Sequence, residues 1–202
     1  AAVGTWPSAE FVRHPLWAGE TAETGPLARH AASPLVRLLL DRGDRISARL
    51  FAKAIDVADC ASTMRHPESD EVAPLIDACE AAPGIGMARI ITARGVLLCW
   101  VRVVEGRIED CAIVPASAWN LHPQGAFCRD ALCLQGDVTD LDAVRKRLEW
   151  MVLAFDPSLP YDRDFRPPEK IGKKDKPIPI SRPNFVTLCG EVVEKLEETY
   201  FD

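Results

Sequence analysis

The sequence predicts an α+β fold in which helices pack around a small antiparallel sheet or hairpin. Two observations support this class. Apolar residues recur at helical spacing in residues 33–60 and again in residues 141–155. Between these stretches, residues 96–104 and 107–114 are rich in β-branched and aromatic side chains, which is typical of strands.

The amino-terminal part predicts an irregular segment followed by helices. Prolines and glycines interrupt residues 1–25, and the bulky residues expected to anchor this segment over a core are Trp6, Phe11, Leu16 and Trp17. Ser33 before Pro34 is a favourable helix start, because serine caps a helix and proline suits its first position. The apolar stripe that follows is interrupted at Gly43, so it predicts one or two long helices. A shorter helix is expected over residues 71–80.

The strand-like stretch predicts a hairpin with a two-residue turn at Glu105-Gly106. The residues that face each other are then Arg102 and Glu109, Trp100 and Cys111, and Leu97 and Val114. Because apolar side chains occur on both faces, we expect both faces of the hairpin to be covered.

The carboxy-terminal part predicts one helix and a tail. The helix spans residues 141–155 and ends at Asp156-Pro157, because the residue before a proline disfavours helical conformation. After Phe165 the composition changes abruptly to prolines and basic side chains. We expect a domain over residues 1–165, a Pro/Lys-rich linker over residues 166–183, and a short segment of unknown role over residues 184–202.

Composition excludes several classes of protein. The net charge of -6, without a continuous basic patch, argues against a nucleic-acid surface over most of the chain, the basic tail excepted. The longest apolar stretches are shorter than the ~20 residues of a membrane-spanning helix, so no membrane insertion is expected. The first residues show neither a secretion signal nor an initiating Met. These features predict a cytoplasmic protein with a truncated amino-terminus.

The seven cysteines show no repeated short spacing, which argues against a disulfide framework and predicts buried free thiols. The four histidines are scattered and lie in no recognisable nucleophilic motif, so an unrelated hydrolytic enzyme is disfavoured. His122 alone lies near the motifs described next, where a surface or turn position is expected.

Four segments, in order, resemble the carboxy-terminal half of nickel–iron hydrogenase large subunits. The segments are Glu23-Thr24-Gly25-Pro26-Leu27-Ala28-Arg29, Ala93-Arg94-Gly95, Val114-Pro115-Ala116-Ser117-Ala118-Trp119-Asn120 and Phe155-Asp156-Pro157. The corresponding family motifs read Glu-Val-Gly-Pro-Leu-Ala-Arg, Pro-Arg-Gly, Val-Pro-Ser-Thr-Trp-Asn and Phe-Asp-Pro-Cys. We call the four segments the first to fourth motifs. The resemblance implies that residues 1–165 form a hydrogenase-large-subunit-like domain whose amino-terminal part is missing.

The resemblance also shows what this chain has lost. Family members hold nickel and iron with two Cys-x-x-Cys pairs, because soft thiolates suit these metals. At the downstream pair and the histidine that follows it, this chain has Ser158, Tyr161 and Asp164, and it contains no Cys-x-x-Cys. We therefore expect no nickel and no hydrogenase activity.

Two residues match positions that contact the cyanide ligands of iron in the family. These are Arg94 in the second motif and Ser117 in the third. The resemblance implies that they lie close together and cradle an anionic iron-dicyanide-carbonyl fragment. The alternative is that Arg94 pairs with a carboxylate while Ser117 sits in a turn.

A large-subunit-like chain without its cysteines resembles the hydrogenase expression/formation proteins of the HupK/HoxV type. This resemblance implies a maturation scaffold or chaperone that holds the iron-dicyanide-carbonyl unit transiently and meets other maturation proteins or hydrogenase subunits. The alternative is a metal-free structural or interaction subunit of a hydrogenase-related or respiratory complex, for which an exposed apolar patch is expected.

Overall fold

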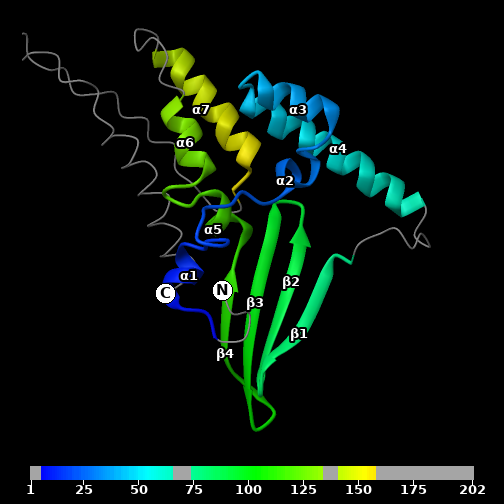
Figure 1. Ribbon diagram of the computed structural model, residues 1–202, viewed down its shortest axis with the longest axis vertical. Coiled ribbons are helices and arrows are strands. Elements are labelled where there is room, and N and C mark those ends of the chain that lie inside the picture. The colour runs from blue at the N-terminus through cyan, green and yellow to red at the C-terminus, as the bar shows by residue number, and fades with distance from the viewer. Residues whose placement is uncertain (1–5, 66–73, 134–140, 158–202) are drawn as a thin grey trace, which may run out of the picture.

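The computed structural model describes residues 6–65, 74–133 and 141–157. Within these ranges the chain forms seven helices and one four-stranded antiparallel sheet, which confirms the α+β class. The helices are α1 (Ala9–Arg13), α2 (Pro26–His30), α3 (Pro34–Asp41), α4 (Arg45–Arg65), α5 (Ala116–Asn120), α6 (Ala126–Cys133) and α7 (Leu141–Phe155). The strands are β1 (Ile76–Ala82), β2 (Ile85–Thr92), β3 (Gly95–Val104) and β4 (Arg107–Val114). Most helices gather at one end of the sheet, and its other end projects away from them (Figure 1).

The predicted helix start and break are both confirmed. Ser33 stands at the N-cap position of α3 and Pro34 is its first residue, although the Ser33 side chain makes no capping hydrogen bond. Gly43, with φ of +79°, lies between α3 and α4, so the apolar stripe forms two helices. Hydrogen bonds from the N–H groups of Gly43 and Asp44 to the carbonyls of Leu40 and Leu39 close the end of α3. This pattern needs a left-handed residue, which glycine adopts without strain.

The sheet is larger than the predicted hairpin, and the helix expected over residues 71–80 is wrong. Residues 76–82 form β1 instead, which pairs antiparallel with β2, and the strand order is β1-β2-β3-β4. The turn between the first two strands has Gly84 at φ of +75°. Backbone pairing with β2 overrides the local helical tendency of this Ala- and Glu-containing segment.

The hairpin turn at Glu105-Gly106 is confirmed, but the predicted register holds only next to it. Val104 faces Arg107 and Val103 faces Ile108, as a two-residue turn requires. A bulge between Arg102 and Val103 then shifts the pairing by one residue. The pairs beyond it are Arg102 with Asp110, Trp100 with Ala112 and Leu98 with Val114, so the predicted partners Glu109, Cys111 and Leu97 are wrong.

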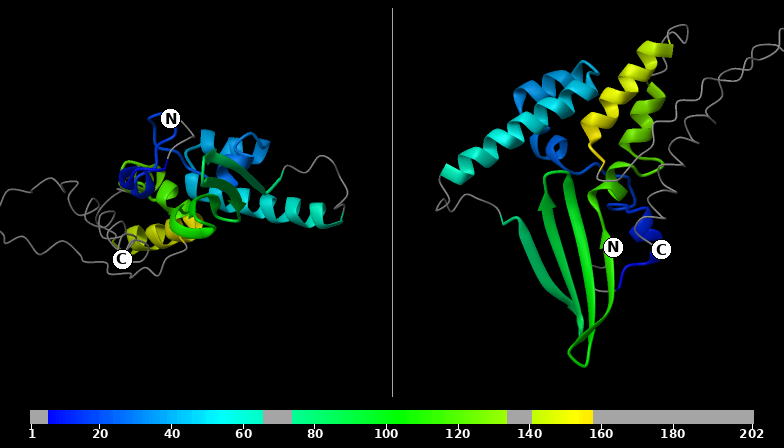
Figure 2. Two further views of the ribbon diagram at one scale, coloured as in Figure 1. Left: turned by 90° about the horizontal axis from the view of Figure 1, so that it is seen from below. Right: turned by 180° about the vertical axis from the view of Figure 1, so that it is seen from behind.

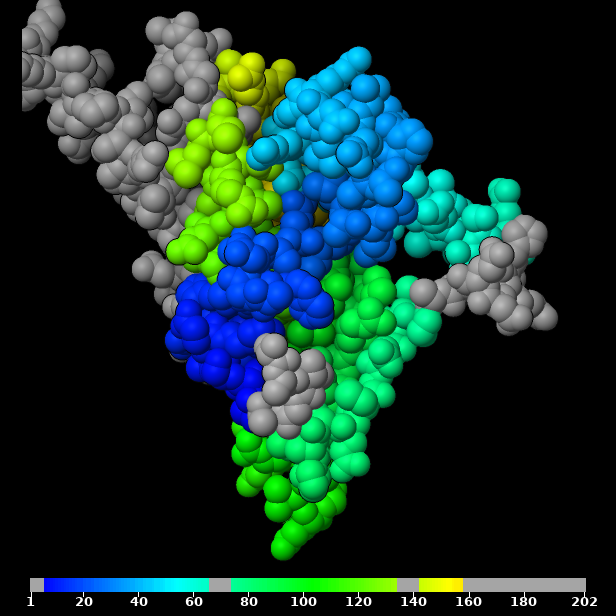
Figure 3. All heavy atoms as spheres, in the orientation of Figure 1, coloured from blue at the N-terminus to red at the C-terminus, as the bar shows by residue number. Residues whose placement is uncertain are grey.

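The described residues cover one face of the sheet and leave the other open, which differs from the expected cover on both faces. The covered face carries a cluster of buried residues from α1, the sheet and α5: Val12, Trp100, Val114, Ala118 and Trp119. Figure 3 shows α1 and the adjoining segment lying over β3 and β4 on this side. On the other face Val103 and Ile113 are each 42% exposed. No described helix crosses that face when the molecule is seen from behind (Figure 2, right).

Two further clusters hold the helices together. One contains Leu121, Phe127, Cys128, Ala131, Met151 and Phe155, and joins α6 to α7. The other contains Val36, Ala48 and Ala52, and joins α3 to α4. Of the expected amino-terminal anchors, Trp6 and Phe11 do pack against the sheet cluster. Leu16 and Trp17 are exposed, the latter by 72%, so that part of the prediction is wrong.

The last described helix matches its prediction from the sequence. Helix α7 spans the predicted residues and ends before Asp156, whose φ is +50°. None of the described helices is long and apolar enough to cross a membrane. Five cysteines in the described ranges are free thiols, namely Cys60, Cys79, Cys99, Cys111 and Cys133. Only Cys128 is fully buried, so the expectation of buried thiols is wrong for most of them, and Cys189 lies outside the described residues.

Candidate functional site

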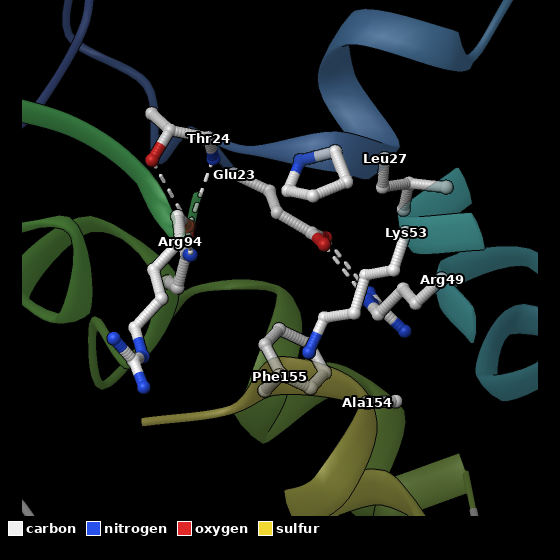
Figure 4. Close-up of a pocket in the computed structure, with 10 residues that line it drawn as sticks. Glu23, Thr24, Leu27, Arg49, Lys53, Arg94, Ala154 and Phe155 are labelled. Carbon is white, nitrogen blue, oxygen red and sulfur yellow. Dashed lines mark hydrogen bonds and ion pairs between the residues drawn. The ribbon is translucent and has the colours of Figure 1, made fainter. Parts of the chain in front are cut away.

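A pocket forms where the β2–β3 turn meets α2, α4 and the end of α7. Its lining residues are Glu23, Thr24, Pro26, Leu27, Arg49, Lys53, Arg94, Asn120, Ala154 and Phe155 (Figure 4). All four motifs contribute to this lining, although they are far apart in the sequence. The pocket is open to solvent, with about 280 Å³ of empty space between its walls when the adjoining open solvent is included.

Asn120 of the third motif joins the first and second motifs. Its side-chain carbonyl accepts a hydrogen bond from the Thr24 backbone N–H at 2.8 Å. Its amide group donates to the backbone carbonyl of Arg94 at 3.3 Å. The Thr24 hydroxyl in turn accepts from the backbone N–H of Val96 at 3.3 Å. One buried amide therefore fixes the spacing of two pocket walls.

Glycines allow the same two motifs to touch through their backbones. A Cβ on Gly25 would lie 2.6 Å from the Arg94 carbonyl oxygen, and φ at Gly25 is +107°. A Cβ on Gly95 would meet the Thr24 hydroxyl, and φ there is +144°. Both positions therefore require glycine for space and for backbone conformation.

A buried ion-pair network forms the wall beside α4. Arg49 is 4% exposed and donates two hydrogen bonds to the Glu23 carboxylate, at 2.8 and 2.7 Å. Its Nη1 lies 2.7 Å from Oδ2 of Asp130, which also pairs with Arg45. Burial by itself lowers the pKa of Arg49, but Glu23 and Asp130 outweigh it and raise the pKa overall. The network holds Glu23 in place at the pocket wall.

Two cations meet the fourth motif at the pocket mouth. Arg94 Nε lies 3.3 Å from Oδ2 of Asp156 and donates to the Asp156 backbone carbonyl at 3.1 Å. Lys53 Nζ lies 3.6 Å from the same Oδ2 and donates to the Leu153 carbonyl at 3.2 Å. Burial lowers the pKa of Lys53, and Asp156 offsets part of that effect. The Arg94 side chain remains 48% exposed, so it combines a carboxylate partner with access to solvent.

Ser117 lies near this pocket but does not line it. The pairing of Leu98 with Val114 and the bond from Asn120 to Arg94 bring the two ends of the hairpin together, as predicted. Ser117 is 5% exposed in α5, and its hydroxyl has no hydrogen-bond partner among the described residues. A shared role of Arg94 and Ser117 in binding a ligand stays a prediction.

Three residues of this chain match metal ligands of the family by resemblance alone. Ser158, Tyr161 and Asp164 lie outside the described residues. Within residues 6–65, 74–133 and 141–157, no group of three or more His, Cys, Asp or Glu side chains is arranged to hold a metal ion. Residues 154–156, just before those positions, form part of the site.

Sequence reasoning missed the contribution of α4. Arg45, Arg49 and Lys53 recur every fourth residue, so they share one face of a helix. This spacing predicts a basic helix face, which could have indicated that α4 contributes charged side chains to the site. His122 is in a turn, as expected, but is only 7% exposed rather than at the surface. Its Nδ1 accepts from the Gln124 backbone N–H, and burial together with nearby His14 lowers its pKa.

Over most of its length the chain is similar to hydrogenase expression/formation proteins. The chain is 31% identical over 166 residues to the hydrogenase expression/formation protein HoxV of Cupriavidus necator, covering 78% of this chain and 41% of that protein. It is 28% identical over 151 residues to the hydrogenase expression/formation protein HupK of Bradyrhizobium diazoefficiens, covering 73% and 40%. The chain thus spans about two fifths of the length of these relatives. No family model matches it.

A second similarity concerns a smaller part of the chain. It is 44% identical over 66 residues to the valine–tRNA ligase of Cutibacterium acnes, covering 33% of this chain and 8% of the ligase. A match to so small a part of the ligase carries no functional statement about this protein.

Proposed function

Because this chain is a relative of the hydrogenase expression/formation proteins HoxV and HupK, we propose that it acts in the maturation of a nickel–iron hydrogenase. Its specific role on this proposal is that of a scaffold or chaperone. It holds the iron-dicyanide-carbonyl unit transiently before that unit reaches the hydrogenase large subunit. Its partners are then other maturation proteins or hydrogenase subunits.

The observation that carries this proposal is the convergence of all four motifs on one pocket. Its mouth presents the cations of Arg94 and Lys53, both with solvent access. An iron-bound cyanide is anionic and accepts hydrogen bonds at nitrogen, so a guanidinium and an ammonium group suit it chemically. The buried Ser117 hydroxyl, without a described partner, supplies a further donor nearby.

The two cations decide where such a cargo binds. Arg94 and Lys53 line the open pocket and keep contact with solvent. We therefore propose that a cyanide ligand of the iron unit meets them there. Hydrogen bonds and charge, rather than thiolate bonds, hold the cargo. Such a contact is reversible, which suits a protein that hands its cargo on.

Infrared spectroscopy tests this role directly. The protein is purified from cells that carry the maturation machinery, because iron-bound cyanide and carbonyl stretches occur where protein does not absorb. We expect such bands in the unchanged chain and their loss in Arg94→Ala. Arg89→Ala is the matched control, since Arg89 lies on β2 and is 45% exposed. If the unchanged chain shows no bands, or Arg94→Ala keeps them, the scaffold proposal is wrong.

One observation favours the second candidate, a metal-free interaction subunit. Apolar side chains on the open face of the sheet are exposed, among them Ile76 by 64% and Ile113 by 42%. An exposed apolar patch is typical of a protein interface. Purification without iron-ligand bands, together with a stoichiometric complex that Ile113→Lys disrupts, would support this role over the scaffold.

A further inference from the structure

Two thiols lie side by side on the open face of the sheet. Cys99 of β3 and Cys111 of β4 have their Sγ atoms 3.9 Å apart. Cys111 is exposed and Cys99 partly exposed. Alternation along the strands explains this placement, because their neighbours Trp100 and Ala112 pack on the covered face. The pair is therefore reachable from solvent and separate from the pocket described above.

The placement of the two residues disfavours a disulfide. Cys99 faces Ile113 and Cys111 faces Val101, so the cysteines are diagonal neighbours rather than direct partners. Diagonal neighbours on adjacent strands are about 7–8 Å apart, whereas a disulfide requires Cα atoms within about 6.8 Å. A disulfide would thus require β3 and β4 to shift relative to each other.

The same separation suits two bonds to one metal ion. Two metal–sulfur bonds of ~2.3 Å span ~3.8 Å at a tetrahedral angle and ~4.6 Å when linear. The observed 3.9 Å between the sulfurs lies within this span, near its tetrahedral end, so a linear arrangement requires the sulfurs to separate by roughly 0.7 Å more.

The surroundings decide which class of ion fits. The direct strand partners of the two cysteines, Val101 and Ile113, offer no ligand. The carboxylate of Asp110 accepts the backbone N–H of Cys111 at 2.9 Å. Zinc would need two more ligands, while copper(I) is satisfied by two soft thiolates. We propose that Cys99 and Cys111 form a site for one soft monovalent cation of the copper(I) class.

Binding at this site is a simple exchange of protons for metal. Both S–H bonds break, two sulfur–copper bonds form, and two protons leave to solvent. The copper stays in its monovalent state and no electron is transferred. The inference stands on the sheet geometry alone and does not depend on the role proposed for the pocket.

A competition titration tests the site. The full chain is titrated anaerobically with copper(I) against a coloured copper(I) chelator, and native mass spectrometry gives the stoichiometry. We expect one tightly held copper per chain. Cys99→Ser and Cys111→Ser should each weaken binding by roughly 10²–10⁴-fold, because each turns a two-point contact into a single one. Cys60→Ser, which removes an exposed thiol on α4, should leave the affinity unchanged.

Several outcomes would overturn the proposal. Unchanged affinity in either of the first two variants would place the copper elsewhere, as would a loss of affinity in Cys60→Ser. Thermal unfolding of each variant without metal separates lost affinity from lost fold, and Cys111→Ser, at an exposed position, should melt like the unchanged chain. A rapid, quantitative Cys99–Cys111 disulfide with a small-molecule disulfide, found by peptide mapping, would show that the pair is a redox couple.

Discussion

The guanidinium of Arg49 lies over the ring of Phe155, with its carbon 3.9 Å from the ring centroid. The same ring meets Phe127 edge-on, with centroids 5.2 Å apart. Since Arg49 also pairs with Glu23 and Asp130, one side chain links the first motif, α6 and the end of α7. The buried guanidinium of Arg49 thus stabilises the pocket wall.

Replacing this charge should destabilise the protein strongly. Arg49→Met keeps the apolar contact with Phe155 but leaves the carboxylates of Glu23 and Asp130 without their buried partner. We expect a loss of about 3–5 kcal/mol in the free energy of unfolding, measured with denaturant. Arg37→Met is the matched control, because Arg37 is 71% exposed and should change stability by less than about 0.5 kcal/mol. Similar losses in both variants would contradict a central role for Arg49.

The close approach of the first two motifs should tolerate no side chain at Gly25. Gly25→Ala places a methyl group against the Arg94 carbonyl at a positive φ. We expect a loss of roughly 1–3 kcal/mol, seen as a lower melting temperature. Gly86→Ala should be nearly neutral, because a Cβ there meets nothing within 4 Å. A Gly25→Ala protein as stable as Gly86→Ala would mean that the two backbones do not touch.

Acid should weaken the contact between α2 and α4. Burial alone raises the pKa of Asp56, but hydrogen bonds from Arg29 and His30 outweigh it and leave the pKa below its ordinary value. A carboxylate with a lowered folded-state pKa stabilises the fold above its unfolded pKa of about 3.9. That contribution disappears as the pH falls through the lower folded pKa. Asp56→Asn should therefore flatten the acid limb of stability against pH, and Asp41→Asn, at an exposed position, should not. Superimposable acid limbs for the unchanged chain and Asp56→Asn would refute this assignment.

The purified chain should hold no stoichiometric nickel and neither evolve nor oxidise hydrogen. The reason is chemical, since Ser158 and Tyr161 offer neutral hydroxyls where the resemblance places thiolates. Elemental analysis and a hydrogen electrode measure both properties. The double variant Ser158→Cys/Tyr161→Cys recreates a Cys-x-x-Cys and serves as a positive control for metal uptake. One nickel per unchanged chain would disprove the expectation.

Features specified by local chemistry could be predicted from the sequence. The Ser33-Pro34 start, the break at Gly43, the turn at Glu105-Gly106 and the end of α7 each depend on a few neighbouring residues. The convergence of the motifs was also predictable in part, because a hairpin brings its own ends together.

Features that depend on distant partners could not be predicted. β1 becomes a strand because β2 pairs with it, and nothing within residues 76–82 requires this. The bulge beside Arg102 moves every later pair by one residue, although the turn itself follows the rule. The ion pairs of Arg49 could not be predicted, because its partners Glu23 and Asp130 are distant in the sequence. Ser117 was expected beside Arg94 in one cradle, whereas the pocket that Arg94 lines does not have Ser117 among its lining residues.

The bond between Thr24 and Asn120 joins residues 96 positions apart, and the pocket walls run from Glu23 to Phe155. No short fragment of the chain carries the complete site. A partly folded chain therefore offers no place for a cargo, because the walls exist only once both ends of the fold have met. On the proposed function, only the folded scaffold can therefore bind its metal fragment.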